Sequence, residues 1–161
     1  MSTTQPRPVT LDFTSGPVVA GALTVPYLGP AWGRKALQLM KEDPRIQEAV
    51  AGVTITVLTR IEGVPDGRYS YLYARFDGNG LADGRMGNEE VELELEGLPA
   101  PTFTIVGPYA TFAAIQHGAL SERKAVLSGR LHIKGSRLLA LRYMGALETV
   151  TEVLAEIPCH P

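Results

Sequence analysis

Alternation of apolar and polar positions predicts β-strands in the middle of the chain. In residues 53–62, valine and isoleucine alternate with threonine and charged residues, which is the period of two that a half-buried strand requires. Residues 65–67 are Pro-Asp-Gly, a combination typical of tight turns. We therefore expect residues 67–76 to return as a second strand and to form an antiparallel hairpin with the first.

The most regular alternation lies in residues 88–97, where glutamates alternate with valine and leucine. This pattern predicts a third strand with one acidic face and one buried face. A row of like charges repels the edge of another sheet, so we expect this strand to protect a sheet edge from unwanted pairing. Shorter apolar runs predict a fourth strand at residues 102–106 and a fifth at residues 130–135.

Apolar residues at helical spacing predict the remaining elements. Residues 31–50 form either two short helices or one helix broken at Asp43, because Pro44 can begin a helix but cannot continue one. The last predicted helix places its leucines on one stripe, which indicates a helix with one apolar face. This last helix covers residues 137–156, and two further helices are predicted over residues 108–117 and 121–128.

The order of these elements predicts the α+β fold class, with one sheet and one layer of helices packed on it. A chain of 161 residues is most simply one domain, which buries roughly two-thirds of the surface of the unfolded chain. Residues 1–30 contain many glycines and prolines, so we expect a partly irregular N-terminal extension. The domain itself is predicted to cover residues 31–161.

Charge and composition argue against several classes of protein. The formal net charge of -2 with scattered basic residues disfavours a general nucleic-acid binder, because neutralising phosphates needs a clustered positive surface. Cys159 is the only cysteine, so no internal disulfide forms and a cytoplasmic location is expected. The apolar run at residues 18–32 contains prolines and is too short for a membrane helix. The first residues also lack the pattern of a secretory signal.

Residues 77–87 resemble a calcium-binding loop, with acidic and amide side chains at alternate positions. The match fails in detail, because Leu81 stands at a ligand position and Asn88 replaces the bidentate glutamate. We therefore interpret this segment as a long connection between two strands, without a metal ion.

The remaining candidate chemical groups have structural interpretations. The histidines have no metal-ligand spacing, and the serines stand at segment ends, where serine caps helices. Tyr69, Tyr71 and Tyr73 form a one-sided row that we interpret as core or cavity lining. We expect no catalytic residue, no metal and no cofactor, and hence no enzyme. The groups considered are His117, His132, His160, Ser121, Ser128 and Ser136.

Residues 102–147 run from a strand into a helix that ends at a glycine, and then through a short segment with an alanine into the strand pattern G-x-L-x-I-x-G and a closing helix. This order resembles the sterol carrier protein type 2 family, and with the upstream helix and strands the likeness covers residues 31–157. The residues that carry the pattern are Gly118, Ala125, Gly129, Leu131, Ile133 and Gly135.

The resemblance implies a five-stranded, mostly antiparallel sheet covered by helices, with an apolar cavity between the layers. It implies non-catalytic binding or transfer of a fatty acid, a fatty acyl-CoA or a sterol-like ligand. Burial alone could hold such a ligand, since each methylene removed from water contributes about 0.8 kcal/mol. The expected ligand-binding residues are Tyr71, Tyr73, Leu93, Leu95, Phe103, Ile105, Phe112, Ile115, Leu141, Met144 and Leu147.

Two other functions stay open. The same fold could serve as an accessory domain that forms a dimer interface or contributes to the substrate pocket of a partner enzyme. A small hydrolase or isomerase is a third alternative, although no base and nucleophile can be paired in the sequence. We expect a lipid or another apolar small molecule as the partner, without nucleic acid or an integral membrane segment. Transient membrane contact and a homodimer remain open.

Overall fold

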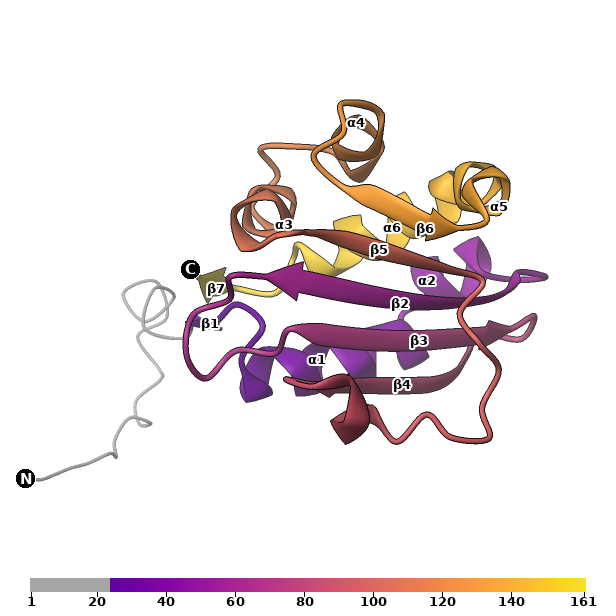
Figure 1. Ribbon diagram of the computed structural model, residues 1–161, viewed down its shortest axis with the longest axis horizontal. Coiled ribbons are helices and arrows are strands. Elements are labelled where there is room, and N and C mark those ends of the chain that lie inside the picture. The colour runs from indigo at the N-terminus through magenta and orange to yellow at the C-terminus, as the bar shows by residue number, and fades with distance from the viewer. Residues whose placement is uncertain (1–23) are drawn as a thin grey trace, which may run out of the picture.

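The computed structural model describes residues 24–161 and contains a five-stranded sheet in the order β4-β3-β2-β5-β6 (Figure 1). Strands β2 and β5 run parallel, and the other neighbouring strands run antiparallel. The predicted α+β class and mostly antiparallel sheet are therefore confirmed. The strands are β2 (Thr54–Glu62), β3 (Tyr71–Asp77), β4 (Leu81–Gly87), β5 (Phe103–Pro108) and β6 (His132–Gly135).

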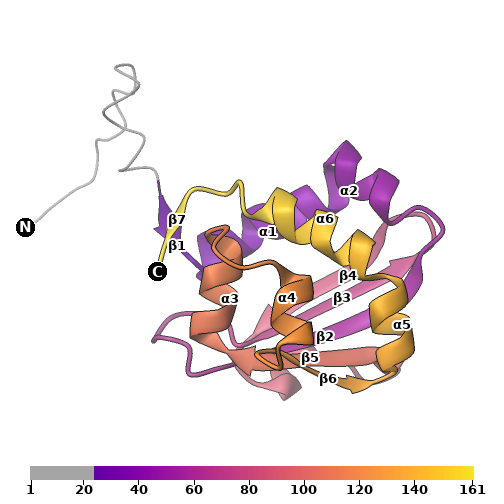
Figure 2. The ribbon, with the colours of Figure 1, turned by 90° about the horizontal axis from the view of Figure 1, so that it is seen from above.

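Helices pack on one face of this sheet, which we call the inner face (Figure 2). Helix α6 contacts α1, α2, α3 and α4, so it lies in the middle of the helical layer. The opposite side of the sheet is called the outer face. The helices are α1 (Pro30–Glu42), α2 (Pro44–Ala49), α3 (Tyr109–Gln116), α4 (Glu122–Leu127), α5 (Arg137–Arg142) and α6 (Met144–Leu154).

The break between α1 and α2 lies at Asp43, so the alternative of two helices is confirmed. The Asp43 carboxylate accepts a hydrogen bond of 2.8 Å from the backbone N–H of Arg45, which caps α2. The Arg45 guanidinium also donates to Glu156 at 2.6 Å. These hydrogen bonds lower the pKa of both carboxyl groups and connect the start of α2 to the segment that follows α6.

The prediction of one continuous helix over residues 137–156 is wrong. The structure divides this segment at Tyr143 into α5 and α6. Leu138 is 78% exposed and Leu141 is 44% exposed, and the buried residue of α5 is Ala140. The buried part of the predicted leucine stripe therefore begins after Leu141. The change of direction at Tyr143 turns α6 back across the other helices (Figure 2), a position that a straight extension of α5 would not reach.

The prediction of the third strand at residues 88–97 is also wrong. The third strand is β4, within the segment that was interpreted as a long connection. Residues 78–80 alone join β3 to β4, and both Gly78 and Gly80 have positive φ angles, which glycine adopts without strain. The Asp77 carboxylate accepts from the backbone N–H of Asn79 at 2.9 Å and holds this tight turn.

Close packing explains why β4 forms despite its weak strand sequence. A Cβ atom at Gly84 would lie 2.5 Å from Leu37 of α1, so glycine allows the helix to approach the strand. The glutamate-rich segment instead forms a 3-10 helix, η4 (Glu90–Leu93). Glu94 then adopts a left-handed conformation with φ 52°, which interrupts any extended run. A strand over this whole segment is therefore excluded.

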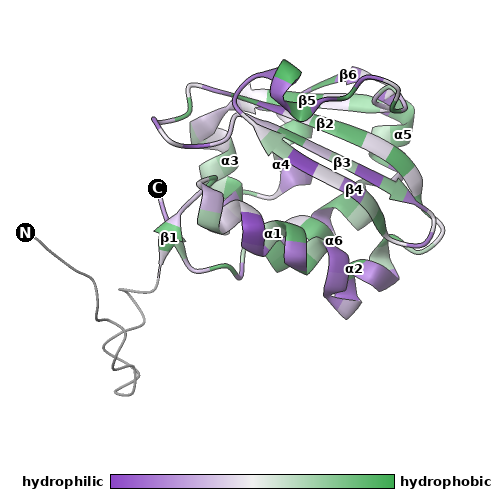
Figure 3. Cartoon of the chain, turned by 90° about the horizontal axis from the view of Figure 1, so that it is seen from below, coloured by the Kyte–Doolittle hydropathy of each residue, from purple (hydrophilic) through white to green (hydrophobic). Residues whose placement is uncertain are grey.

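The two faces of the sheet carry two separate apolar clusters. The large one lies between the inner face and the helices and includes Trp32, Val57 and Phe76. The small one lies on the outer face, where η4 covers Leu58 and Tyr73 with Leu93. In Figure 3 the strands of the sheet carry apolar and polar positions side by side, and α2 is mostly polar. Period-two alternation along each strand thus supplies both clusters.

A short parallel pair closes the described chain near its two ends. Strand β1 (Val25–Pro26) pairs with β7 (Cys159–His160), and the backbone N–H of Tyr27 donates to the carbonyl of His160 at 2.9 Å. The first described residues are therefore held in place by the last ones. Most of the predicted N-terminal extension, residues 1–23, lies outside the described residues.

Candidate functional site

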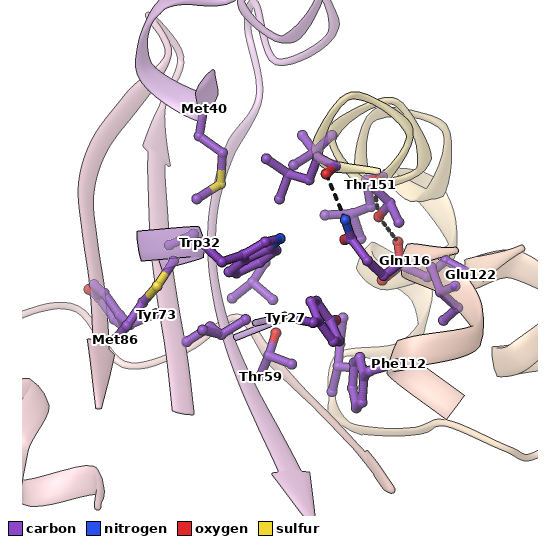
Figure 4. A pocket seen from close by; sticks show the side chains of 18 of the residues that line it. Tyr27, Trp32, Met40, Thr59, Tyr73, Met86, Phe112, Gln116, Glu122 and Thr151 are labelled. Carbon is purple, nitrogen blue, oxygen red and sulfur yellow. Dashed lines mark hydrogen bonds between the residues drawn. The ribbon is translucent and has the colours of Figure 1, made fainter. Parts of the chain in front are cut away.

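A cavity of about 140 Å³ lies between the inner face of the sheet and helices α1, α3 and α6 (Figure 4). Most of its lining is aliphatic or aromatic, with residues from four strands and several helices. The lining residues are Tyr27, Trp32, Met40, Val57, Thr59, Leu72, Tyr73, Ala74, Phe76, Met86, Ile105, Phe112, Ile115, Gln116, Glu122, Leu147, Val150, Thr151 and Leu154.

Small side chains on the central strands leave room for this cavity. Thr59 of β2 and Ala74 of β3 lie on the inner face, and both keep part of their surface exposed although the helices cover them. Across the cavity, Leu147, Val150 and Leu154 of α6 are also only partly buried. The helical layer is therefore held at a distance from the middle of the sheet, where a solid core would bring these side chains into contact.

Two polar groups lie among the apolar lining residues near α6 and α1. Gln116 is 5% exposed, and its Nε2 donates to the carbonyl of Leu154 at 2.9 Å. Trp32 is 2% exposed, and its indole Nε1 has no hydrogen-bond partner among residues 24–161. The indole N–H can only donate, and Figure 4 shows it directed into the cavity. A buried donor without an acceptor is costly, so this group favours an acceptor atom in the cavity.

Glu122, at the start of α4, is the acidic residue of the cavity. Its Oε1 lies 2.9 Å from the Thr151 hydroxyl, which also lies 2.9 Å from the carbonyl of Leu147. Burial raises the pKa of Glu122 to about 7; the Thr151 hydrogen bond opposes this rise, and the charge of Glu148 adds to it. The Thr151 hydroxyl donates to the Glu122 carboxyl group and so connects it to α6.

A second depression, of about 250 Å³, adjoins the cavity on its α4 side. The two share Ile115, Glu122 and Thr151 as lining residues. The depression is more acidic than the cavity, because Glu148 and Glu152 also line it. Glu122 therefore stands where a molecule would pass between the depression and the apolar interior.

The structure brings five of the eleven predicted ligand-binding residues to the cavity and places six elsewhere. Ile105, Phe112, Ile115 and Leu147 line it with their side chains. Tyr73 borders it, but its ring packs on the outer face with Leu58 and Leu93. Their role as ligand contacts stays a prediction. The residues that lie away from the cavity are Tyr71, Leu93, Leu95, Phe103, Leu141 and Met144.

The reasons for these six placements differ. On β3, Leu72 and Ala74 face the helices, so Tyr71 and Tyr73 face outward. Tyr69 precedes the strand and lies beside Gly33 of α1, so the predicted one-sided row is not formed. Leu93, the last residue of η4, and Leu95 pack on that outer face. Phe103 and Met144 are each 1% exposed and belong to the packed part of the inner cluster. Leu141 lies on the solvent side of α5 and is partly exposed.

Sequence reasoning missed the polar residues of the cavity. Trp32 stands at helical spacing with Ala36 and Met40, a signal that could have placed it on the inner side of α1. Gln116 and Glu122 give no such signal, because polar residues near helix ends are ordinarily exposed. Only the packing of α3 and α4 against α6 turns them inward.

The described residues show neither a metal centre nor a membrane span. Within residues 24–161, His, Cys, Asp and Glu side chains nowhere gather in threes as metal ligands. None of the helices in this part of the chain is long and apolar enough to cross a membrane.

Comparison with known proteins gives a consistent result for the family and the fold. The model of the SCP-2 sterol transfer family matches residues 36–148. A crystal structure of sterol carrier protein 2 has a TM-score of 0.64 with 16% identity, covering 79% of this chain and 95% of that one. A comparison with curated proteins gives no match.

Two solution structures are also similar. A conserved hypothetical protein from Thermus thermophilus, described in terms of a sterol carrier protein, has a TM-score of 0.65 and 16% identity, covering 83% of this chain and 91% of that one. The sterol carrier protein domain 2 of Helicoverpa armigera has a TM-score of 0.51 and 17% identity, covering 78% and 86%. At these identities the structures show a shared fold.

Proposed function

Because the chain belongs to the SCP-2 sterol transfer family, we propose that it binds an apolar lipid between sheet and helices and transfers it without covalent chemistry. The ligand classes are a fatty acid, a fatty acyl-CoA or a sterol-like molecule. The observation that carries the proposal is the apolar cavity between the inner face and the helices.

The chemistry of the lining supports an apolar ligand. Val57, Leu72 and Ile105 from the sheet face Phe112 and Leu154 from the helices across the cavity. Removing a ligand methylene from water contributes about 0.8 kcal/mol, so a chain of several carbons would be held without strong polar contacts. Few directed polar groups are needed for such binding, and the cavity supplies few.

The size of the cavity determines how a longer ligand would be accommodated. About 140 Å³ is close to the volume of roughly 150 Å³ in which an engineered apolar cavity binds benzene. A ring or a short stretch of acyl chain therefore fits as the structure stands. A longer molecule would extend past Ile115 and Thr151 into the adjoining depression, or would move α6 away from the sheet.

Binding of fluorescent fatty-acid and sterol analogues tests this function. We expect saturable fluorescence changes and a higher melting temperature, because a ligand at 100 times its Kd adds about 2.7 kcal/mol to the stability of the folded state. Transfer would be followed as movement of the analogue from donor to acceptor vesicles. The proposal fails if no analogue binds or shifts the melting temperature.

A further inference from the structure

We infer that Glu122 determines the ligand selectivity of the cavity, which takes uncharged lipids bearing a hydrogen-bond donor in the head group and an acceptor oxygen nearer the chain, and disfavours free carboxylates. This inference rests on the proposed function, because it names the ligand class of the same cavity. The family resemblance does not say whether charged or uncharged lipids bind better, and this inference does.

The position of Glu122 is the first step of the argument. Together with Ile115 and Thr151 it lines both the apolar cavity and the adjoining depression. A lipid with its chain in the cavity and its head group in the depression would pass beside this carboxyl group. In Figure 4 the Glu122 carboxyl group reaches Thr151 on the inner side of α6, so it lies within reach of the ligand.

The charges around this position are the second step. Glu122, Glu148 and Glu152 line the depression, and no Lys, Arg or His of the described residues does. Arg123, the next residue along α4, is 50% exposed and donates to Glu148 at 3.0 Å. A ligand carboxylate in the depression would meet like charges without a cation in the lining, and like charges in a partly buried site repel. A hydroxyl group can instead donate to Glu122.

The unpartnered indole of Trp32 is an independent observation on the same cavity. Trp32 is 2% exposed, its Nε1 has no acceptor in the part of the chain that the structure describes, and it is directed into the cavity. A pure hydrocarbon cannot accept this hydrogen bond, whereas an ester, ketone or hydroxyl oxygen can. A well-matched ligand therefore supplies a hydrogen-bond acceptor for the Trp32 indole and a hydrogen-bond donor for the Glu122 carboxyl group. A monoacylglycerol, with its ester carbonyl and free hydroxyl groups, has both.

Two molecules with the same ten-carbon acyl chain test the inference: 1-decanoylglycerol and decanoate. Their affinities would be measured by displacement of a neutral fluorescent lipid at pH 8, where Glu122, with its pKa of about 7, is mostly ionised. We expect the wild-type protein to bind decanoylglycerol at least tenfold more tightly. In Glu122→Gln, which keeps the shape but removes the charge, this ratio should fall below threefold.

Glu62→Gln is the matched control, because Glu62 is exposed at the end of β2 and lines neither void. It should keep the wild-type ratio. Equal affinities of the wild-type protein for the two molecules would overturn the inference and leave lipid binding intact, and so would an unchanged ratio in Glu122→Gln. If neither molecule binds and the fluorescent lipids do not bind either, the proposed function fails together with the inference.

Discussion

The two faces of strand β3 differ in how they are filled. On the outer face, Tyr73 is 1% exposed and packs directly against Leu58 and Leu93. On the inner face, its neighbour Ala74 faces the cavity and keeps part of its surface exposed. The same strand therefore borders a solid cluster on one side and a hollow one on the other.

The covering elements explain this difference. A short segment around η4 lies directly on the outer face, and Arg85 donates to the carbonyls of Leu93 and Glu94 at 2.9 and 2.8 Å. Helices cover the inner face, and Trp32 of α1 and Phe112 of α3 line the cavity between these helices and the sheet. Small residues on the strand then leave space in the middle. A cavity in this fold therefore depends on the distance between the sheet and the helical layer, as well as on the apolar content of the strands.

Truncating one leucine on each face of the sheet should give the largest difference in stability between the two faces. Leu93→Ala removes a side chain that is 1% exposed, and we expect a loss of about 2–5 kcal/mol in the free energy of unfolding. Leu147→Ala should cost less than half as much, because Leu147 faces the cavity and has fewer neighbours to lose. Urea denaturation measures both. Equal losses would contradict a hollow inner face.

The free energy of unfolding should depend on pH because Glu122 is buried on the inner side of the sheet. Its pKa rises from 4.5 in the unfolded reference to about 7 in the fold, so the native state holds a proton that the unfolded chain has released. Stability should therefore fall as the pH rises from about 4.5 to 7, by up to about 3 kcal/mol at 1.4 kcal/mol per unit.

Subtracting the stability profile of Glu122→Gln isolates this contribution, since the variant has no such titration. Glu90→Gln is the control for the other side of the sheet, because Glu90 is exposed on η4, and its profile should match the wild type. A parallel pair of profiles for wild type and Glu122→Gln would show that the Glu122 carboxyl group is not buried.

A larger side chain in the cavity should weaken lipid binding with little effect on the stability of the fold. Ala74→Leu adds a side chain to the hollow inner face, so we expect lipid affinity to fall at least tenfold, or about 1.4 kcal/mol. The free energy of unfolding should change by less than about 1.5 kcal/mol, because the added atoms occupy existing space. Ala110→Leu makes the same change at an exposed position of α3 and should leave affinity unchanged. Undiminished binding by Ala74→Leu would place the ligand elsewhere.

The smallest expected effect concerns the glutamate-rich segment of the outer face. Alternation in the sequence would bury Val91 and Leu93 on the same side of a strand, whereas in the structure Val91 is 76% exposed. We therefore expect Val91→Ser to change the free energy of unfolding by no more than about 0.5 kcal/mol. A loss of stability comparable to that of Leu93→Ala would mean that Val91 is buried, as the predicted strand requires, and would contradict the 3-10 helix.

Much of the fold was predictable because its signals are local. Strands β2 and β5 follow from alternating apolar residues, the break at Asp43 follows from Pro44, and the caps of α4 and α5 are Ser121 and Ser136. Strand β4 was not predictable, because its seven residues include Gly84 and Gly87 and gain their strand conformation from pairing with β3. Here tertiary packing overrides local preference.

The candidate site was less predictable than the fold. Residues such as Phe112 and Leu147 could be assigned to an apolar interior from helical spacing, but spacing does not tell a packed position from a cavity wall. Phe103 and Ile105 lie two residues apart on the same face of β5, yet only Ile105 borders the cavity. The inward position of Glu122 depends on contacts between α4 and α6, which are distant in sequence, so no local pattern predicts it.

Native mass spectrometry of the protein purified without detergent tests whether the cavity on the inner face holds a lipid, as we propose. We predict a protein ion that carries an apolar, uncharged molecule, which is released on denaturation and which Ala74→Leu no longer retains. A protein ion without any adduct, both as purified and after incubation with excess 1-decanoylglycerol, would contradict the claim.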